Sequence, residues 1–282
     1  MIKDYHTHTG NSDGTKTPEE LIDLAVSKGV SALAVSDHDS IKGLETAQNY
    51  SKGKLDFLPG VEFTTREEHY PHCDGKYCLH LLGYGFDIHN KELNDALDDR
   101  AARVRKTYDV LIKSLEKYGM FFDYTQVDIS CGIVMQMLDI AAHIEKNYSD
   151  NPNLEKAVED VYNYSSALDS ENFSLKDSID LIHKAGGKAV WAHPFNVYRN
   201  FKKQLIDENQ AEAILKKAIS LGVDGIEAIY GDFTHEERLS LCRLAEKYGL
   251  FVTCGSDFHG FKNKRNHFIS FDTDEYSQFD VL

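Results

Sequence analysis

Histidines and carboxylates recur in this sequence where short apolar runs, predicted to be strands, come to an end. His6-Thr7-His8 closes the first run, and an i, i+2 spacing on a strand points both imidazoles to one face. Neutral imidazoles and carboxylates are the ligands that zinc, manganese and iron take in proteins. Similar clusters follow along the chain: Ser12-Asp13-Gly14, Asp37-His38-Asp39, Gly60-Val61-Glu62, His80, Ala192-His193-Pro194 and Gly255-Ser256-Asp257-Phe258-His259-Gly260.

Each cluster alone has an ordinary structural explanation. A lone His-x-His is more often a hydrogen-bonded pair than a metal site, and Asp37-His38-Asp39 would serve as a helix N-cap. Ligand-type clusters at six strand ends are harder to explain in this way. Burying that many polar groups is costly unless a metal or hydrogen-bond partners satisfy them. The combination therefore predicts a metal centre, although no single cluster does.

The elements that carry these clusters alternate between short apolar runs and amphipathic segments, which is typical of a parallel β/α architecture. Thr17-Pro18-Glu19-Glu20, for example, combines an N-cap, a proline at the first helical position and a capping-box glutamate. In a parallel β/α barrel the carboxyl ends of all strands meet at one mouth, so the clusters should converge there. The pattern predicts seven strands, at residues 2–8, 31–36, 56–63, 76–83, 188–192, 225–230 and 250–255.

Two segments depart from the simple alternation. Asp74-Gly75 is a two-residue turn signal and predicts a hairpin between residues 67–73 and 76–83, with His69 opposite His80. Residues 91–171 are charged, rich in tyrosine and helical in pattern. We interpret them as a helical insertion beside or over the barrel mouth, within one domain that spans residues 1–282.

Composition limits the protein classes. With 41% hydrophobic and 27% charged residues, the 282-residue chain is expected to fold into a globular domain without a membrane span. The N-terminus lacks an apolar signal core, and the five cysteines are irregularly spaced, so we expect reduced thiols and a cytoplasmic location. A net charge of −15 argues against binding nucleic acid over the whole surface. This charge does not exclude a nucleotide or a short polynucleotide as a substrate.

The clusters, in their order from residue 6 to residue 260, resemble the motifs of the PHP (polymerase and histidinol phosphatase) family of metal-dependent phosphoesterases. The resemblance covers nearly the whole chain. It implies an α/β fold, a distorted seven-stranded (β/α)7 TIM-like barrel, which agrees with the strand count made from the sequence pattern.

The resemblance also implies up to three divalent metal ions (Mn²⁺, Zn²⁺ or Fe²⁺). The ligands of the first would be His6, His8, Glu62 and Asp257. Those of the second would be Asp13, His38 and His259, and those of the third Glu62, His80 and His193, with Glu62 bridging. The catalytic residues would be Glu62, Asp257 and His193, around a hydroxide that is shared between two metals and attacks phosphorus in line.

Substrate contacts are expected around the mouth. Arg199 follows His193 by six residues and is placed to reach a phosphate from a loop. His235 is expected to line the mouth, since the family often has a histidine near this point. Lys262 and Arg265 belong to a basic segment after the last ligand, for which a phosphate-binding rim and a solvated surface loop are equally good interpretations.

Within the family, the chain looks most like the branch that dephosphorylates 3′,5′-bisphosphonucleosides or trims short RNA from the 5′ end. That branch usually carries an arginine and a histidine in a Thr-Arg-Pro-His-like stretch of the insertion. The best-matching segment here, residues 132–138, places Gln136 and Leu138 at those positions, so the nucleotide substrate does not follow from the chemistry. We expect a small phosphorylated substrate, no membrane association and no stable protein partner.

Several alternatives stay open. Histidinol-phosphate phosphatase would use the same chemistry on another ester. A metal-dependent amidohydrolase is less favoured, because that class often uses a carboxylated lysine where this chain has Glu62. A non-catalytic PHP module is also less favoured, because such modules typically lose ligands and this chain keeps them all. A separate metal site at His69, His72, Cys73 and Cys78 is left undecided.

Overall fold

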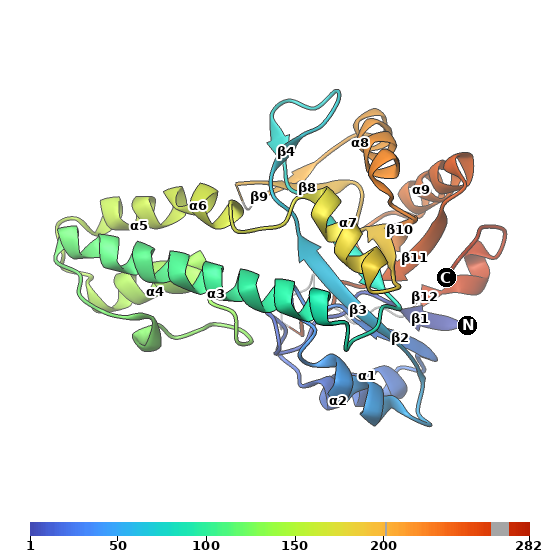
Figure 1. The fold of residues 1–282 in the computed structure, drawn as a ribbon, viewed down its shortest axis with the longest axis horizontal. Helices are drawn as coiled ribbons and strands as arrows, with labels where there is room; N and C mark the ends of the chain where they lie inside the picture. Colours follow the sequence, from blue (N-terminus) through green and yellow to red (C-terminus); the bar gives the residue numbers. More distant parts are fainter. Residues whose placement is uncertain (201, 261–270) are drawn as a thin grey trace.

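The barrel is built from one curved sheet (Figure 1). The computed structural model describes residues 1–200, 202–260 and 271–282. Over these residues the sheet has eight strands in the order β11-β10-β7-β6-β3-β2-β1-β12. Their bounds are β1 (Ile2–Asp4), β2 (Ala32–Val35), β3 (Asp56–Thr64), β6 (His80–Tyr84), β7 (Lys188–Trp191), β10 (Gly225–Tyr230), β11 (Phe251–Gly255) and β12 (Phe271–Asp272). The seven predicted strands are present, and β12 is the strand of this sheet that the sequence pattern missed.

The two ends of the sheet approach each other. The Tyr5 amide donates a hydrogen bond of 2.9 Å to the Cys254 carbonyl, and Thr7 forms a parallel bridge with Phe258. The chain just past β1 is thereby joined to the chain at and beyond the end of β11. The strand ends that carry the histidine and carboxylate clusters are therefore drawn into a ring.

The prediction of an all-parallel barrel is wrong at two places. Strand β6 runs antiparallel to both of its neighbours, β3 and β7, and the edge strand β12 runs antiparallel to β1. The physical reason at β6 is the connection from β3, which contains a hairpin and no helix. A parallel crossover needs a longer link, usually a helix, whereas a short link reverses the chain direction.

The hairpin itself has a different register from the one predicted. Strands β4 (Glu68–His69) and β5 (Lys76–Tyr77) pair His69 with Lys76, so the predicted pairing of His69 with His80 is wrong. The loop takes up residues 70–75 instead of two residues, because Tyr70 is buried in the barrel core. In β6, His80 lies opposite Thr64 of β3.

A second hairpin was not predicted. Strands β8 (Asn196–Arg199) and β9 (Lys202–Leu205) follow His193 directly. Reciprocal backbone hydrogen bonds of 2.7 and 2.9 Å join Cys78 and Tyr198, so this hairpin pairs with the end of the first one. The two hairpins together form one side of the barrel mouth.

Helices cover the outside of the barrel. They are α1 (Pro18–Ser27), α2 (Leu44–Ser51), α7 (Leu175–Lys184), α8 (Glu208–Leu221) and α9 (His235–Tyr248), and a short 3-10 turn, η3 (Thr273–Tyr276), follows β12. The predicted capping box of Thr17 and Glu20 is present at the start of α1. The barrel core includes the fully buried side chains of Phe63, Leu81 and Trp191. This packing holds the strand ends in fixed positions.

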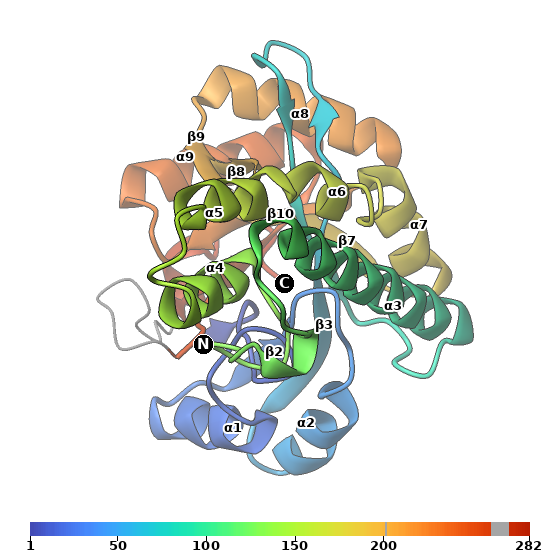
Figure 2. The same ribbon diagram turned by 90° about the vertical axis from the view of Figure 1, so that its left-hand side faces the viewer.

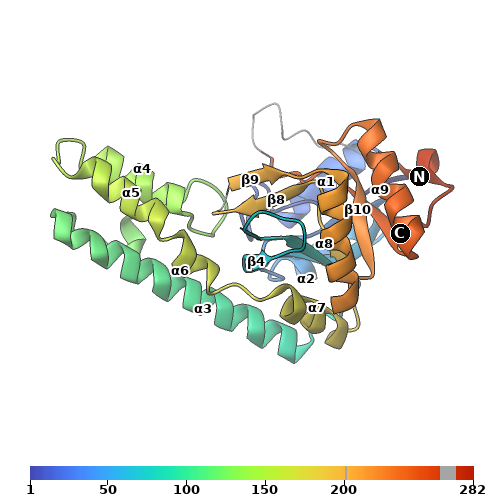
Figure 3. The same cartoon turned by 90° about the horizontal axis from the view of Figure 1, so that it is seen from above.

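Residues 91–171 extend away from one side of the barrel (Figures 1 and 3). In the view from that side, their helices lie in front of the strands (Figure 2). They include α3 (Lys91–Ser114), η1 (Leu115–Tyr118), η2 (Tyr124–Gln126), α4 (Met137–Asn147), α5 (Leu154–Asn163) and α6 (Ser165–Asp169). A second apolar core, with Leu111, Leu115, Ile140 and Ile144 fully buried or nearly so, holds these helices together. We propose that they form an insertion within one domain.

The helices that the structure describes include none with the length and apolarity needed to cross a membrane.

Candidate metal centre

Glu62 lies at the centre of the barrel mouth, with 1% of its surface exposed. Its Oε2 atom is 3.0 Å from Nε2 of His6 and 3.2 Å from Nε2 of both His8 and His38. These residues come from the ends of β1, β2 and β3. One carboxylate oxygen of β3 thus faces three imidazole nitrogens from the ends of two strands, β1 and β2, as the strand-end positions predicted.

The other oxygen of Glu62 faces the opposite part of the ring. Its Oε1 atom is 2.8 Å from Nδ1 of His80 and 3.3 Å from Nε2 of His193. His80 begins β6 and His193 follows β7. Glu62 therefore contacts five imidazoles through its two oxygens, which is the geometry expected of a residue placed between cations.

Two aspartates complete the cluster. Oδ1 of Asp257 lies 3.2 Å from Nε2 of His8 and 3.4 Å from Nε2 of His6. Oδ1 of Asp13 lies 3.3 Å from Nε2 of His259 and 3.8 Å from Nδ1 of His8. All nine side chains that were expected to be metal ligands are therefore brought to one place.

Three groups of these side chains are close enough to hold a cation, all of them at the mouth among the described residues. The first group is the expected one: His6, His8, Glu62 and Asp257. The second adds one histidine to the expected set and consists of His8, Asp13, His38 and His259. The third is His38, Glu62 and His80, with His38 in the place expected for His193. No group in the described chain includes His69, His72, Cys73 or Cys78.

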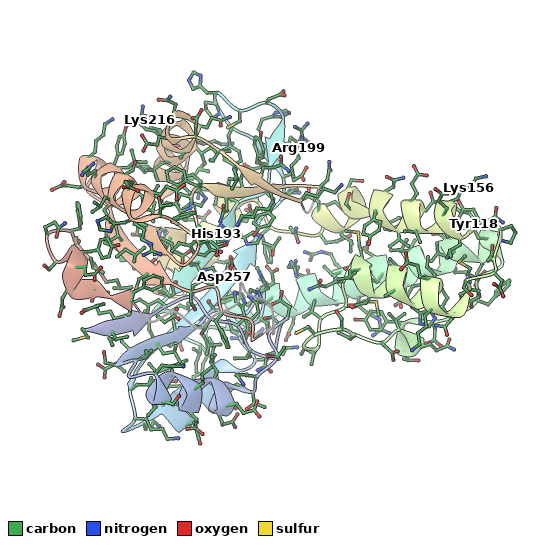
Figure 4. All side chains as sticks on the ribbon, turned by 180° about the vertical axis from the view of Figure 1, so that it is seen from behind. Tyr118, Lys156, His193, Arg199, Lys216 and Asp257 are labelled. Atoms are coloured by element: carbon green, nitrogen blue, oxygen red, sulfur yellow. The ribbon has the colours of Figure 1, made fainter. Side chains whose placement is uncertain are left out.

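Backbone geometry turns two of these side chains into the mouth. His193 and Asp257 have positive φ angles of 31° and 56°, which non-glycine residues seldom adopt. Each lies where the chain leaves a buried strand. Figure 4 shows both side chains inside the barrel part of the molecule. Such strained positions persist where the surrounding structure fixes them, and they are concentrated at functional sites.

Three residues that sequence reasoning missed surround the cluster. Glu227 of β10 hydrogen-bonds the ring of His6, and Tyr230 donates a bond of 2.8 Å to Oδ2 of Asp257. Tyr198 of β8 stacks on the ring of His80 at 4.4 Å between centroids. A signal existed for Glu227, because a carboxylate inside the apolar strand run of residues 225–230 requires a buried partner.

The charges within the cluster balance one another. Burial alone would raise the pKa of Glu62, but the surrounding imidazoles, His38 first, hold it well below its usual range. The pKa of Asp257 is likewise held low, chiefly by His6 and His259 against the effect of burial. Burial alone would lower the pKa of His8, but Asp257 and Glu62 raise it to about 10. The carboxylates are therefore ionised and ready to bind a cation.

The ring nitrogens of His8 show that the cluster fits a metal. Both are buried, and neither has a hydrogen-bond partner among the residues that the structure describes. Nε2 is 3.2 Å from Glu62 and from Asp257, but it is not aligned with either for a hydrogen bond. A buried nitrogen without a partner is destabilising, and a metal bound to its lone pair would satisfy it. The donor set of imidazoles and carboxylates is that of a divalent metal site.

A cavity of about 1430 Å³ joins this cluster to the insertion. On the barrel side its lining includes Asp13, His38, His80, Asp257 and His259. On the insertion side its lining includes Arg100, Arg105, Tyr108, Tyr124 and Tyr162. A ligand in the cavity would therefore touch the metal cluster and the insertion together.

Comparisons with known proteins place the chain in a family. The model of the PHP domain family matches residues 4–233. The chain belongs to the PHP domain family. It is 28% identical over 262 residues to a 5′-3′ exoribonuclease of Haemophilus influenzae, across 91% of this chain and 89% of the relative. It is 26% identical over 269 residues to a 3′,5′-nucleoside bisphosphate phosphatase of Chromobacterium violaceum, across 91% and 86%.

A solved structure agrees with these matches. The crystal structure of a proposed metal-dependent phosphoesterase from Bifidobacterium adolescentis superimposes with a TM-score of 0.69 at 25% identity, covering 98% of this chain and 94% of the other. This PHP protein is therefore a metal-dependent phosphoesterase, a hydrolase that acts on phosphoester bonds. Its substrate is not fixed by these likenesses.

Two of the four residues expected to bind substrate in this PHP protein, Arg199 and His235, are not among the described residues that line the cavity. Arg199 lies at the end of β8, where its Nη1 donates a hydrogen bond of 3.1 Å to the Asp74 carbonyl, and it does not line the cavity. Figure 4 shows it apart from His193 and Asp257. This hydrogen bond directs it towards the other hairpin, to which Asp74 belongs. Lys262 and Arg265 lie outside the described residues.

His235 is also absent from the cavity lining in the described part of the chain. It is the first residue of α9, is exposed, and has the ring of Tyr276 6.2 Å away. One cation in the cavity lining that sequence reasoning missed is Arg100 of α3. The sequence could have indicated Arg100, because it lies on the apolar stripe of a helix with Leu93, Leu97 and Tyr108, where a charged side chain needs a partner.

Proposed function

We propose that this PHP protein hydrolyses phosphate esters of small nucleotides, with a 3′,5′-bisphosphonucleoside or the 5′ end of a short RNA as the substrate. The observation that carries the proposal is the cavity of about 1430 Å³, which joins the metal cluster to arginine and tyrosine side chains of the insertion. This volume exceeds the roughly 300–1,000 Å³ of ordinary small-molecule sites. Two relatives whose names specify such substrates support the same proposal.

Arg100 is the best-placed phosphate contact. It lines the cavity, where Nη2 lies 2.9 Å from Asp39 and 2.6 Å from Asn172, so its guanidinium is held in a fixed orientation. Its Nε atom is buried and has no hydrogen-bond partner in the structure. Since a guanidinium has five N–H donors, a phosphate oxygen can accept from those that remain.

The nucleoside part of the substrate has a matching surface. The guanidinium of Arg105 lies 3.5 Å from the ring centroid of Tyr124, and both residues line the cavity. Ile133, Val134 and Leu138 line it as well and are largely exposed. Stacked and apolar surfaces of this kind suit a base or a ribose. The segment of residues 132–138 carries no cation, so we expect the nucleoside to lie against it.

The residues of the cluster divide the chemistry between them. When bound, divalent metal ions would polarise the phosphoryl oxygens and activate water for attack on phosphorus. His6, His8, Glu62 and Asp257 would hold one such ion, and the two further groups would hold others. Nδ1 of His193 donates to the Asn196 carbonyl at 3.0 Å, so Nε2, which lies 3.3 Å from Glu62, is the nitrogen left for a metal. Tyr230 fixes the carboxylate of Asp257.

A substrate panel on the metal-reconstituted protein tests the proposal. It would compare adenosine 3′,5′-bisphosphate, a short 5′-phosphorylated RNA and histidinol phosphate. We expect one of the first two to be preferred, and a clear preference for histidinol phosphate would contradict the nucleotide substrate. His193→Ala, run beside it, should lower turnover by orders of magnitude and keep the circular dichroism spectrum of the wild type. Undiminished turnover in this variant would show that the site is misplaced.

A further inference from the structure

One segment of the insertion rests directly on the loop that carries Asp13. The Ile133 amide donates a hydrogen bond of 3.1 Å to the Ser12 carbonyl. The Cys131 thiol donates one of 2.8 Å to the Asp13 carbonyl. Two consecutive peptide groups of the loop are therefore held by a segment that lies more than a hundred residues further along the chain.

Gly132 makes this approach possible. Its φ angle is +63°, and a Cβ atom placed on it would lie 1.9 Å from the Ser12 carbonyl oxygen and 3.1 Å from Cα of Asp13. Both atoms belong to backbone, which cannot rotate away as a flexible side chain can. Any other residue at this position would therefore push the segment and the loop apart.

The same loop is held from the barrel side by Asp37, which is 1% exposed. Its Oδ1 accepts hydrogen bonds from the Thr9 amide at 2.6 Å and from the Ser12 hydroxyl at 2.7 Å. Its Oδ2 accepts one from the Thr9 hydroxyl at 2.6 Å. Asp13 follows Ser12, so its position depends on two anchors, one on the barrel and one on the insertion.

We propose that Cys131, Gly132 and Ile133 are positioning residues for the metal group formed by His8, Asp13, His38 and His259. The contact places the loop so that Oδ1 of Asp13 stays 3.3 Å from Nε2 of His259. Ile133 also lines the cavity, so the segment that supports Asp13 would itself touch a ligand there. The inference rests on the proposed metal centre and does not depend on which ester is the substrate.

Gly132→Ala tests the proposal, with Gly119→Ala as the matched control. Gly119 is also in the insertion and has a φ angle of +76°, but an added Cβ there would meet nothing within 4 Å. The two variants share the backbone strain and differ in the clash with Ser12. Mn²⁺ titrations of the full-length proteins, with free Mn²⁺ followed by electron paramagnetic resonance, would give the number and the affinity of bound ions.

We expect Gly132→Ala to lower the Mn²⁺ affinity of one class of sites by about tenfold or more, which is the usual effect of losing a group that supports a metal ligand. The remaining ions should bind as in the wild type, and excess Mn²⁺ should restore occupancy. Asp13→Asn should weaken the same class, and Gly119→Ala should match the wild type. Wild-type binding by Gly132→Ala would overturn the inference and leave the metal centre standing. A wild-type protein that binds no Mn²⁺ would overturn both.

A second pair of variants decides the matter if Gly132→Ala fails to fold. Cys131→Ala removes only the thiol that donates to Asp13, whereas Cys131→Ser keeps a donor at that position. We expect Cys131→Ala to weaken the same class of Mn²⁺ by about two- to tenfold, the range of one hydrogen bond. Cys131→Ser should lose less. Equal, wild-type affinities in both variants would overturn the inference.

Discussion

His6 and Glu227 form a buried carboxylate–histidine pair behind the metal cluster. Nδ1 of His6 lies 2.9 Å from Oε1 and 3.1 Å from Oε2 of Glu227, and both residues are fully buried. A carboxylate only accepts hydrogen bonds, so a ring that gives up its second proton to a bound metal keeps the other on Nδ1. Nε2, which faces Glu62 and Asp257 at the mouth, is then the nitrogen left for a metal. Glu227 also accepts from the His193 amide at 2.9 Å, which couples two strand ends.

Glu227→Ala should lower the metal affinity of the group around His6 by about 10- to 100-fold, because the ring loses the partner that fixes its tautomer and orientation. Glu227→Gln should lose less, since its amide oxygen can still accept from Nδ1. Isothermal titration with Mn²⁺ would measure both.

Asp224→Ala is the control for this prediction. Asp224 pairs with His183 at 2.8 Å, a contact of similar length that is outside the metal groups. Its loss should leave metal affinity unchanged. Equal metal affinities in Glu227→Ala and the wild type would show that Glu227 has no part in orienting His6.

Arg100→Ala should raise KM much more than it lowers kcat, because we propose that its guanidinium binds a phosphate of the substrate away from the reacting atoms. The lost charged hydrogen bond is worth about 1.5–3 kcal/mol, or about 10- to 100-fold in KM. Arg100→Lys keeps the charge and should recover part of the loss. Steady-state kinetics with the preferred substrate of the panel would measure these changes.

Arg103→Ala provides the comparison on the same helix. Arg103 pairs with Asp99 and Glu171 and does not line the large cavity. Its kinetics should match those of the wild type. If the two alanine variants change KM equally, the effect belongs to the packing of α3 and not to phosphate binding.

Metal binding should stabilise the folded protein. At a free Mn²⁺ concentration of about 100 times the Kd, mass action adds about 2.7 kcal/mol to the free energy of unfolding. For a chain of this size this is a rise of several degrees in Tm, measurable by calorimetry before and after chelation. Asp257→Asn should reduce the rise, whereas His235→Ala, at a histidine outside the cluster, should keep it. A Tm that is unaffected by chelation would contradict the metal centre.

The convergence of the nine ligand-type side chains could be predicted because each follows or begins a strand of the barrel. A short apolar run and its flanking turn signals determine each strand locally, and barrel closure then brings all strand ends to one mouth. His6 and Asp257, for example, are far apart in the sequence, but they follow β1 and β11, and closure of the barrel joins the ends of these two strands. The expectation of a closed barrel was enough to place them together.

Contacts between irregular segments could not be predicted in this way. Cys131 meets Asp13 across 118 residues, and no periodicity in either segment indicates the other. Arg199 was expected at the mouth from its distance along the chain after His193, but its side chain is directed instead by a hydrogen bond to the Asp74 carbonyl in the other hairpin. The register of the first hairpin also depends on the burial of Tyr70 in the barrel core. The turn signal at Asp74-Gly75 gives no information about this burial.

The protonation of His8 gives a pH-dependent stability in the metal-free protein. Asp257 and Glu62 raise its pKa to about 10 against the effect of burial. The pKa of His6 is raised chiefly by Glu227, and the pKa of His193 chiefly by Glu62, again against burial. A raised pKa favours the protonated folded state. The resulting stability is fully present below the unfolded pKa of about 6.5 and is lost as pH rises towards the folded value.

Between pH 7.5 and 8.5, His8 should lower the free energy of unfolding by about 1.4 kcal/mol per pH unit, because the folded state keeps a proton that the unfolded state has released. Urea unfolding of the metal-free protein, prepared with a chelator, at several pH values would measure the slope. His8→Gln should remove the contribution of this one histidine from the slope. Ring ¹H–¹⁵N spectra should show His8 protonated at pH 8. A His8 ring that titrates near pH 6.5 would contradict the prediction, because the carboxylates would then not be stabilising its charge.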